Sequence, residues 1–383
     1  MLNFGIKGND LKEFHGLLFS SHQLFIRMQM MDLSHNHEKD ISDIFLDGQV
    51  DYDDEGDVEA SASLQFFDPS NIMDIVSNSP NHGAMFADRM IRVLFCVGRV
   101  DGTKWFVVPL ITGPITKLDR DRNFINCNIS GKEYLLYSSG VVATYGSKRQ
   151  ITDVMTDILR DNGEKKFSVK KRSKKLNKKL AVGGTENTPW SAIKSLAGAL
   201  GDVVAYDGNG AFYHRDKNTK SMFTFDETKM TTEPQFGYNL DNLINRVKVI
   251  GAKPKGKKKK RVSYTVTAPK SHPLSPHALG RNGKPRYYTL TIEDEKLKSK
   301  KACRNLAKRR LKQGLMEAQE ASFETLAVPH LQKGDFVTVK TANFQTKVPC
   351  RKRSISLKTP GKMTFGFNKN MKPATAMIRR NKK

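Results

Sequence analysis

Residues 189–250 constrain the fold of this chain most, because they place a helix, a tight hairpin and a strand in a fixed order. Four apolar residues recur at helical spacing, namely Ile193, Leu196, Ala197 and Leu200, and Gly201 follows where a helix end favours positive φ. The sequence Asp-Gly-Asn-Gly at 207–210 predicts a hairpin, since primed turns need residues that tolerate positive φ. A further strand is predicted over 243–251. The run holds no obvious catalytic residue, and any small α+β unit can contain such pieces.

Short strands dominate the predicted structure of residues 18–140, which follow an N-terminal extension of residues 1–17. Apolar and polar residues alternate there in the pattern of half-buried strands, over 24–30, 60–66, 91–97 and 125–129. The dipeptide Gly113-Pro114 is expected to break the chain before the next strand. About six short strands with regular turns predict an antiparallel β-barrel or sandwich.

The remaining chain is predicted to hold a mixed domain and a second β domain. Residues 141–239 form the mixed α+β domain, with a lysine-rich loop at 164–180. Residues 240–367 form the β domain, with a lysine-rich loop at 253–261 and a helix at 295–316. That helix is expected to bury one stripe of side chains, namely Ala302, Leu306, Leu311 and Leu315. Residues 368–383 form a basic C-terminal tail without a pattern that would bury it.

The net charge of +26 is unevenly distributed along the chain. Segment 164–180 holds nine Lys and Arg residues and one acid, segment 253–261 holds seven bases, and segment 351–383 holds eleven bases. These segments account for the whole excess, so the rest of the chain is neutral in sum. We therefore expect the positive charge to belong to loops and a tail.

Such basic runs can bind a polyanion electrostatically. Aromatic residues of the kind that single-strand binders interleave with their charges are nearly absent from them. The runs fit solvated loops with nonspecific polyanion contacts, and they also fit a specific acidic partner. The candidate polyanion or partner contacts are Lys170, Lys171, Arg172, Lys174, Lys175, Lys178, Lys179, Lys257, Lys258, Lys259, Lys260, Arg261, Arg379 and Arg380.

Cysteine usage and hydropathy indicate a soluble product that is not secreted. Cys96, Cys127, Cys303 and Cys350 are scattered without CxxC pairing, which suits a reducing compartment. The first two are expected to act as small hydrophobes. No signal peptide is expected at the N-terminus, and the longest apolar stretch, 105–111, is too short to cross a membrane.

No metal, cofactor or catalytic site is predicted. The acidic residues after Asp51 suggest a calcium loop, but the EF-hand pattern needs an acid at its twelfth position, where Ala62 stands, so a solvated turn is favoured. His35 and His37 have no cysteine or further histidine nearby that would complete a metal site, so a polar loop is favoured. Motifs of the GxSxG, HExxH and Walker types are missing from the sequence, and we expect no enzyme.

The two tryptophans, Trp105 and Trp190, are expected to anchor cores rather than to stack on ligands. The basic helix at 295–316 is expected to present a solvated face rather than to recognise nucleic acid.

The order of several weak motifs resembles the tail hub (baseplate hub) proteins of tailed bacteriophages, the group that includes late control protein D of contractile tails. The resemblance covers residues 20–367. Its motifs are Asp43-Ile44 before Val50, Phe66-Phe67-Asp68-Pro69, Thr112-Gly113-Pro114-Ile115, 131–135, 190–200 with 206–208, 243–251, 272–276, the Ala-rich basic helix at 295–316 and 329–339. The heavy basicity departs from the family pattern.

The resemblance implies a mainly β fold with α+β, in which two related tube-type antiparallel β-barrel or sandwich domains flank a mixed α+β domain. It implies a homotrimeric, pseudo-sixfold ring that joins the hexameric tail tube or distal tail ring to a threefold tail tip or fibre and lines the genome-delivery channel. The implied partners are a distal tail or tail tube protein, a tip or fibre protein, the tape-measure protein and passing phage DNA. The implied location is the virion tail tip, after assembly in the host cytoplasm. The alternative is a basic nucleic-acid-binding protein whose lysine-rich loops contact phosphates.

Overall fold

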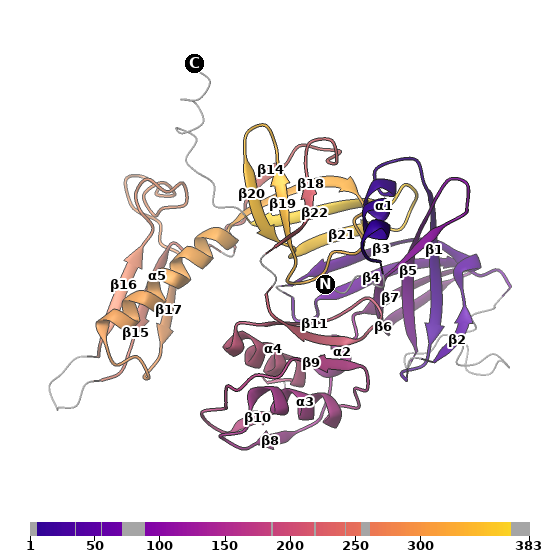
Figure 1. Ribbon diagram of the computed structural model, residues 1–383. Coiled ribbons are helices and arrows are strands. Elements are labelled where there is room, and N and C mark those ends of the chain that lie inside the picture. Colours follow the sequence, from indigo (N-terminus) through magenta and orange to yellow (C-terminus); the bar gives the residue numbers. More distant parts are fainter. Residues whose placement is uncertain are drawn as a thin grey trace, which may run out of the picture. The chain divides into compact units, whose positions relative to one another are not determined.

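The computed structural model describes residues 6–34, 36–54, 56–70, 89–184, 187–217, 220–241, 243–253 and 261–368 (Figure 1). The chain divides into two compact units. Unit 1 comprises Met1–Glu233 and Phe323–Phe365, and unit 2 comprises Pro234–Ser322 and Gly366–Lys383. The domain boundaries proposed above, at 140, 239 and 367, stay predictions. No helix in the described ranges is long and apolar enough to cross a membrane.

A large antiparallel sheet forms much of unit 1, in the strand order β21-β3-β4-β7-β6-β5-β1-β2 (Figure 1). β21 pairs with β3, so the C-terminal part of the chain completes a sheet that the N-terminal part begins. The mainly β fold predicted from the sequence is confirmed. The bounds of this part are β1 Gln23–Met31, β2 His37–Asp40, the 3-10 turn η1 Ser42–Ile44, β3 Phe45–Asp53, β4 Ala60–Phe67, β5 Met90–Gly98, β6 Trp105–Asp121, β7 Phe124–Ser130 and β21 Lys352–Ser356.

The period-two patterns place one face of these strands in the core. Met28, Leu64, Phe66, Ile125 and Cys127 are all at most 3% exposed. Full burial of one such side chain contributes about 1.5–3 kcal/mol, which fixes the register because a slip of one residue would expose the whole set. All four cysteines are free and buried.

Strand β6 corrects the prediction of a break at Gly113-Pro114. The strand continues because it pairs with β5 up to Pro114 and with β7 from Ile115 onward. A Cβ atom on Gly113 would lie 1.7 Å from the carbonyl oxygen of Ser130, so the glycine permits close contact between backbones.

Trp105 corrects a second prediction, because 43% of it is exposed. Its indole lies over Gly98 of the paired strand β5, where a Cβ atom would come within 2.7 Å of the ring. Trp105 therefore covers a glycine on the outer face of the sheet. Trp190, in contrast, is fully buried and is the core anchor that the sequence predicts.

The mixed part of unit 1 builds a core of its own around Trp190, Met155 and Ile158. Helix α4 begins at an N-cap, where the Thr188 hydroxyl accepts a hydrogen bond from the Ser191 amide, and it ends at left-handed Gly201, as the sequence predicts. The predicted 207–210 hairpin joins β11 and β12. The bounds are α2 Glu133–Tyr137, β8 Ala143–Tyr145, α3 Ile151–Asp161, β9 Phe167–Val169, β10 Leu180–Val182, α4 Pro189–Leu200, β11 Val203–Tyr206 and β12 Phe212–Arg215.

Helix α1 (Asn9–Leu17) lies in the segment predicted as an N-terminal extension, yet its Phe14 is fully buried. The Phe14 ring packs 5.5 Å from Phe106 and 5.4 Å from His330, measured between ring centroids. Further strands of unit 1 are β13 Ser221–Phe225, β19 Phe336–Lys340 and β20 Gln345–Pro349. Strands β18 (Gln319–Leu326) and β22 (Lys362–Asn368) each begin in one unit and end in the other.

Unit 2 pairs a small sheet with one long helix. β15 (Arg246–Ile250) lies between antiparallel β16 (Ser263–Thr267) and parallel β17 (Thr289–Glu293), and β14 (Gln235–Tyr238) pairs with the first residues of β18. Helix α5 (Lys300–Glu317) starts at the Ser299 N-cap, later than the predicted helix.

The buried face of α5 differs from the predicted stripe. Leu311 and Leu315 are buried as predicted, but Cys303, Ala307 and Gly314 complete the stripe. Ala302 and Leu306 are only partly buried. Gly314 belongs to the packed face because a Cβ atom there would lie 2.5 Å from Cβ of Ile244.

Candidate functional site

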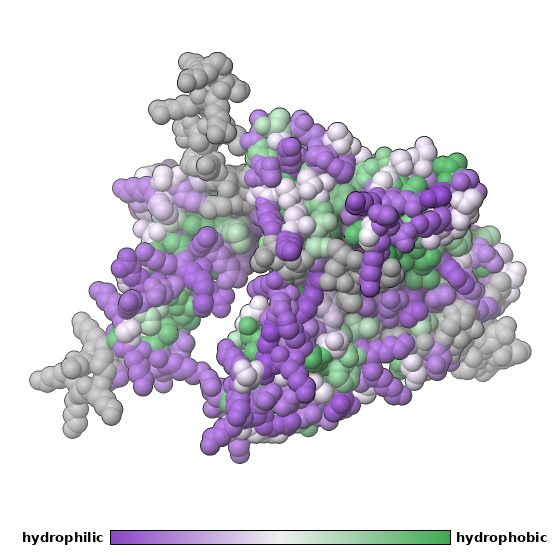
Figure 2. All heavy atoms as spheres, in the orientation of Figure 1, coloured by the Kyte–Doolittle hydropathy of each residue, from purple (hydrophilic) through white to green (hydrophobic). Residues whose placement is uncertain are grey.

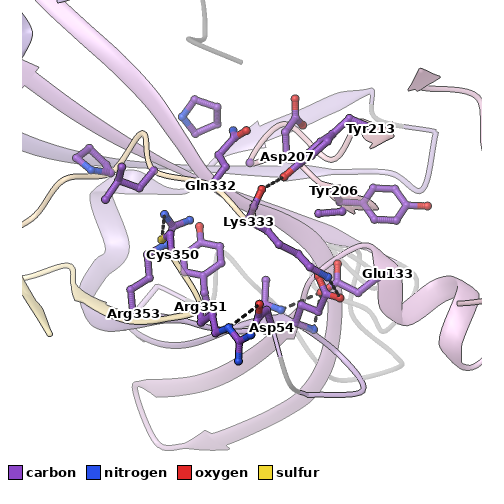
Figure 3. Close-up of a pocket in the computed structure, with 18 residues that line it drawn as sticks. Asp54, Glu133, Tyr206, Asp207, Tyr213, Gln332, Lys333, Cys350, Arg351 and Arg353 are labelled. Atoms are coloured by element: carbon purple, nitrogen blue, oxygen red, sulfur yellow. Dashed lines mark hydrogen bonds and ion pairs between the residues drawn. The ribbon is translucent and has the colours of Figure 1, made fainter. Parts of the chain in front are cut away.

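A cavity of about 50 Å³ in unit 1 is lined by several charged and polar side chains (Figure 3). Its walls come from the end of β3 and the following turn, the start of α2, the β11–β12 hairpin and the segments 329–333 and 350–353. Segments from the start, middle and end of unit 1 therefore meet here. We name it the polar junction, with Tyr52, Glu59, Glu133, Tyr213, Gln332, Lys333 and Arg353 as its central residues.

Two buried carboxylates share one side of the polar junction. The Lys333 ammonium donates to Glu59 Oε1, and Glu133 Oε1 accepts hydrogen bonds from the backbone amides of Glu59 and Ala60 at 2.9 and 2.8 Å. Burial raises the pKa of Glu59 to about 7 against the opposing effect of Lys333, and Glu133 adds to the rise. Burial also raises the pKa of Glu133, which its backbone hydrogen bonds oppose.

A second ion pair fixes the segment that carries Lys333. Arg215, at the end of β12, donates to Asp335 Oδ1 at 2.9 Å and to the carbonyl oxygen of Lys333 at 2.7 Å. The Tyr213 hydroxyl donates to the same carbonyl oxygen at 3.2 Å. Asp335 Oδ2 accepts from the backbone amide of Gln332 at 3.0 Å. The hairpin strand and the 332–335 turn are thus held together by polar contacts.

The third component is a buried guanidinium. The Arg353 guanidinium carbon lies 3.9 Å from the centroid of the Tyr52 ring, and Nη1 donates to Cys350 Sγ at 3.8 Å. The Tyr52 hydroxyl donates to the carbonyl oxygen of Leu110. Arg353 is 6% exposed, so the stacked arrangement compensates for removing its charge from water.

The volume of the cavity limits which molecules the polar junction can hold. A volume of about 50 Å³ holds a few water molecules, whereas sites for small organic ligands usually enclose roughly 300–1,000 Å³. Lys333, Arg215 and Arg353 each contact a carboxylate or an aromatic ring of unit 1. The arrangement therefore suits a structural lock between distant segments better than a substrate site. Among the described residues, no group of three or more His, Cys, Asp or Glu side chains can hold a metal ion.

A related lock lies in the mixed part of unit 1. Lys132, 5% exposed, donates to Glu164 Oε1 at 2.8 Å. Glu164 also accepts from the backbone amides of Lys165 and Lys166 at 2.9 Å. Burial lowers the pKa of Lys132, and Glu164 opposes that shift. Glu164, the single acid of segment 164–180, therefore forms its contacts inside unit 1.

Three of the bases predicted to contact a polyanion, Lys170, Arg172 and Lys174, instead contact other groups of unit 1. Arg172 donates to Asp202 at 2.8 and 3.0 Å and also contacts Asp216, which in turn pairs with Lys170. Lys174 donates to the carbonyl oxygen of Ala199. These bases fasten the segment to the neighbouring α4 and β12.

The other predicted contacts are dispersed. Lys171, Lys175, Lys178 and Lys179 are exposed, and Arg261 pairs with Glu293 at 2.8 Å and Glu295 at 2.7 Å. Lys257, Lys258, Lys259, Lys260, Arg379 and Arg380 lie outside the described residues, as do His35 and the side chain of His37. A polyanion or partner contact at these bases stays a prediction.

The residues of the polar junction are not among the sites predicted from the sequence. One signal was present, because Arg353 shares the inward face of a period-two strand with buried Ile355 and Leu357. A charge at a core position of such a strand indicates a buried polar network. Glu59 and Lys333 carry no comparable signal.

Several solved structures of tail proteins share this fold, two of them from prophages. The 43 kDa tail protein of prophage MuSo2 from Shewanella oneidensis is 10% identical, with a TM-score of 0.59 over 91% of this chain and 98% of that chain. A tail protein from Neisseria meningitidis MC58 is 12% identical, with a TM-score of 0.58 over 90% and 97%. Prophage tail protein gp18 from Listeria monocytogenes EGD-e is 14% identical, with a TM-score of 0.51 over 92% and 97%. The chain thus has the fold of these tail proteins along nearly its whole length, as the resemblance implied. No family model matches the sequence, and no curated protein does.

Proposed function

We propose that this chain is a structural hub subunit in the tail of a bacteriophage. The observation that carries the proposal is the shared fold from end to end, which covers 98% of the Shewanella prophage tail protein and 97% of the Neisseria tail protein. A likeness that spans whole chains on both sides supports a similar structural role better than a shared single domain would.

The proposed assembly is a homotrimeric ring with pseudo-sixfold symmetry, built from two related β domains per subunit. It joins the tail tube or a distal tail protein to a threefold tip or fibre protein. Closed rings need complementary faces on each subunit. The outer face of the β1–β5–β6 sheet offers an apolar candidate, since Phe25, Cys96 and Val107 form one cross-strand row and Trp105 lies beside it. Phe25, Trp105 and Val107 are 43–49% exposed, and Figure 2 shows hydrophobic surface in the region where Figure 1 labels β1 and β5.

The same proposal places the protein at the tail tip of the virion, assembled in the host cytoplasm. The tape-measure protein and phage DNA would pass through the channel of the ring. We assign the subunit no enzymatic role, because the buried charges of the polar junction bind one another around a cavity too small for an organic substrate. The alternative role as a nucleic-acid-binding protein that uses its lysine-rich loops has less support, since Lys170, Arg172 and Lys174 already contact groups of unit 1.

Native mass spectrometry tests the proposal and its interface together. The wild-type protein is expected as a trimer of about 130 kDa, from a chain of 43.2 kDa. Trp105→Asp with Val107→Asp should convert the trimer to folded monomer. Thr116→Asp is the matched control, since Thr116 is exposed on the same strand beyond the apolar row, and it should leave the trimer intact. A wild-type monomer at micromolar concentration would overturn the ring, and an unchanged trimer in the double variant would overturn this interface.

A further inference from the structure

Unit 2 carries most of the excess positive charge of the chain. It contains 28 of the 65 Lys and Arg residues but only six of the 39 Asp and Glu residues. Lysine-rich segments supply part of this excess, but many of the bases lie on described helix and strand positions. The charge of unit 2 is therefore built into its folded body as well as its loops.

The three-stranded sheet of unit 2 has one covered face and one open face. Val247 and Val249 of β15 are fully buried with α5 in the core of the unit. Because side chains alternate along a strand, Arg246, Lys248 and Ile250 lie on the opposite face. The register places six residues of the neighbouring strands on that face with them, namely Ser263, Thr265, Thr267, Thr289, Thr291 and Glu293. We call these nine residues the open face.

The open face has a regular chemical pattern. Arg246 lies between Thr267 and Thr289, and Lys248 lies between Thr265 and Thr291. Lys248 and all four threonines are exposed, and Arg246 is partly exposed. Directly opposed positions in a sheet lie about 5 Å apart, so each base has hydroxyl groups on both sides. The unit thus presents two parallel rows of hydroxyl, cation and hydroxyl.

Neighbouring groups leave these two rows strongly positive. Glu293 is the acid among the nine residues, and the Arg261 guanidinium pairs with it at 2.8 Å. The Arg246 guanidinium carbon lies 4.8 Å from the ring centroid of Tyr287, which is 47% exposed. That stacking restricts the position of the Arg246 side chain.

This chemistry favours one class of partner. Cationic and hydroxyl side chains are the groups that contact nucleic-acid phosphates. A protein partner would need apolar anchors, of which the open face offers only Ile250. Single-stranded nucleic acid would need several exposed aromatic rings for stacking, whereas none of the nine residues of the open face is aromatic.

We propose that the open face of unit 2 binds the phosphate backbone of duplex DNA without reading its sequence. The inference goes beyond the ring-forming role and does not require it. It also moves the nucleic-acid contact from the lysine-rich loops to strand residues that hold hydroxyl and cationic groups in a fixed register.

Fluorescence anisotropy of the full-length protein with a mixed-sequence 20-base-pair duplex tests this inference between 50 and 200 mM NaCl. Arg246→Gln with Lys248→Gln should weaken binding at least tenfold at 100 mM NaCl. It should also reduce the slope of log affinity against log salt by nearly 2, because each phosphate contact contributes about 0.9. Thr265→Val with Thr291→Val keeps β-branched side chains and should weaken binding several-fold with an unchanged salt slope.

The matched control is Lys308→Gln with Lys312→Gln, which removes two exposed cations from α5 on the other side of the sheet. It should lower affinity less than twofold. If this control removes as much affinity as the open-face pair, or if the threonine variant binds like wild type, the positive charge acts diffusely and the site is overturned. Equal binding of poly-glutamate, with the same loss in the threonine variant, would assign the face to an acidic protein instead. Native mass spectrometry of the same variants shows whether the trimer still forms. A loss of DNA binding can therefore be distinguished from a loss of the ring.

Discussion

Lys333 donates a hydrogen bond to Glu59, although the two residues are 274 positions apart in the chain. The contact joins the segment after β18 to the turn between β3 and β4, inside the polar junction. Because Glu59 is 8% exposed, its carboxylate depends on Lys333 and on the surrounding hydrogen bonds for compensation. This one contact leads to two predictions on stability.

Lys333→Met should destabilise unit 1 by about 2–4 kcal/mol at pH 8, since it leaves a buried carboxylate without its cation. Urea unfolding followed by tryptophan fluorescence measures the loss, because Trp105 and Trp190 both lie in unit 1 and Trp190 is fully buried there. Lys358→Met is the matched control, since Lys358 pairs with Asp47 at 2.7 Å on the surface with 66% of its side chain exposed. That control should cost less than about 1 kcal/mol, and equal losses in the two variants would contradict the lock.

The pH dependence of stability should carry the signature of Glu59. Its pKa is raised from 4.5 to about 7 in the folded protein, so the folded state binds more protons than the unfolded state in that range. Stability contributed by this group is therefore complete below pH 4.5 and is lost as pH rises through 7, by up to about 3 kcal/mol. Glu59→Gln should remove this loss, and a variant that keeps the same slope between pH 4.5 and 7 would exclude Glu59 as its source.

A histidine pair should make the attachment of α1 sensitive to acid. His15 Nε2 lies 3.0 Å from His330 Nε2, and burial lowers the pKa of His330 to about 3, with nearby His15 and Arg353 adding to the effect. Burial also lowers the pKa of His15, as does Lys229. The unfolded chain then binds more protons between pH 3 and 6.5, so stability should fall as pH drops through this range.

His330→Phe should reduce that acid-side loss, because a phenyl ring suits the aromatic contacts with Phe14 and Phe223 and does not titrate. Thermal melts at pH 7 and pH 4.5 measure the difference. An equal drop in melting temperature for the variant and the wild type would mean that other groups cause the acid sensitivity.

Gly113→Ala should destabilise unit 1 by roughly 3 kcal/mol or more, since the new methyl group meets the carbonyl oxygen of Ser130 and the backbones must separate. Gly140→Ala is the matched control, because a Cβ atom at Gly140 would have no atom within 4 Å. The melting temperature of the Gly140→Ala variant should stay within about two degrees of that of the wild type. A tolerated alanine at Gly113 would show that β6 and β7 approach each other less closely there.

The sequence patterns correctly predicted those features that depend on residues close together in the chain. The alternation in β1, β4 and β7, the end of α4 at Gly201 and the 207–210 hairpin were all predicted correctly, because neighbouring residues decide them. Gly113-Pro114 was misread as a break because its role depends on Ser130, which belongs to another strand. Trp105 was misplaced because the space over Gly98 cannot be seen before the strands are paired. The junction between Glu59 and Lys333 was missed for the same reason, since no local pattern links positions 274 apart.

Single-particle electron microscopy of the purified protein shows directly whether three copies assemble into a ring. We expect a closed ring of three subunits around an axial channel, with six similar β domains visible on one face. A lone subunit, a twofold dimer, or an open chain of subunits would contradict it.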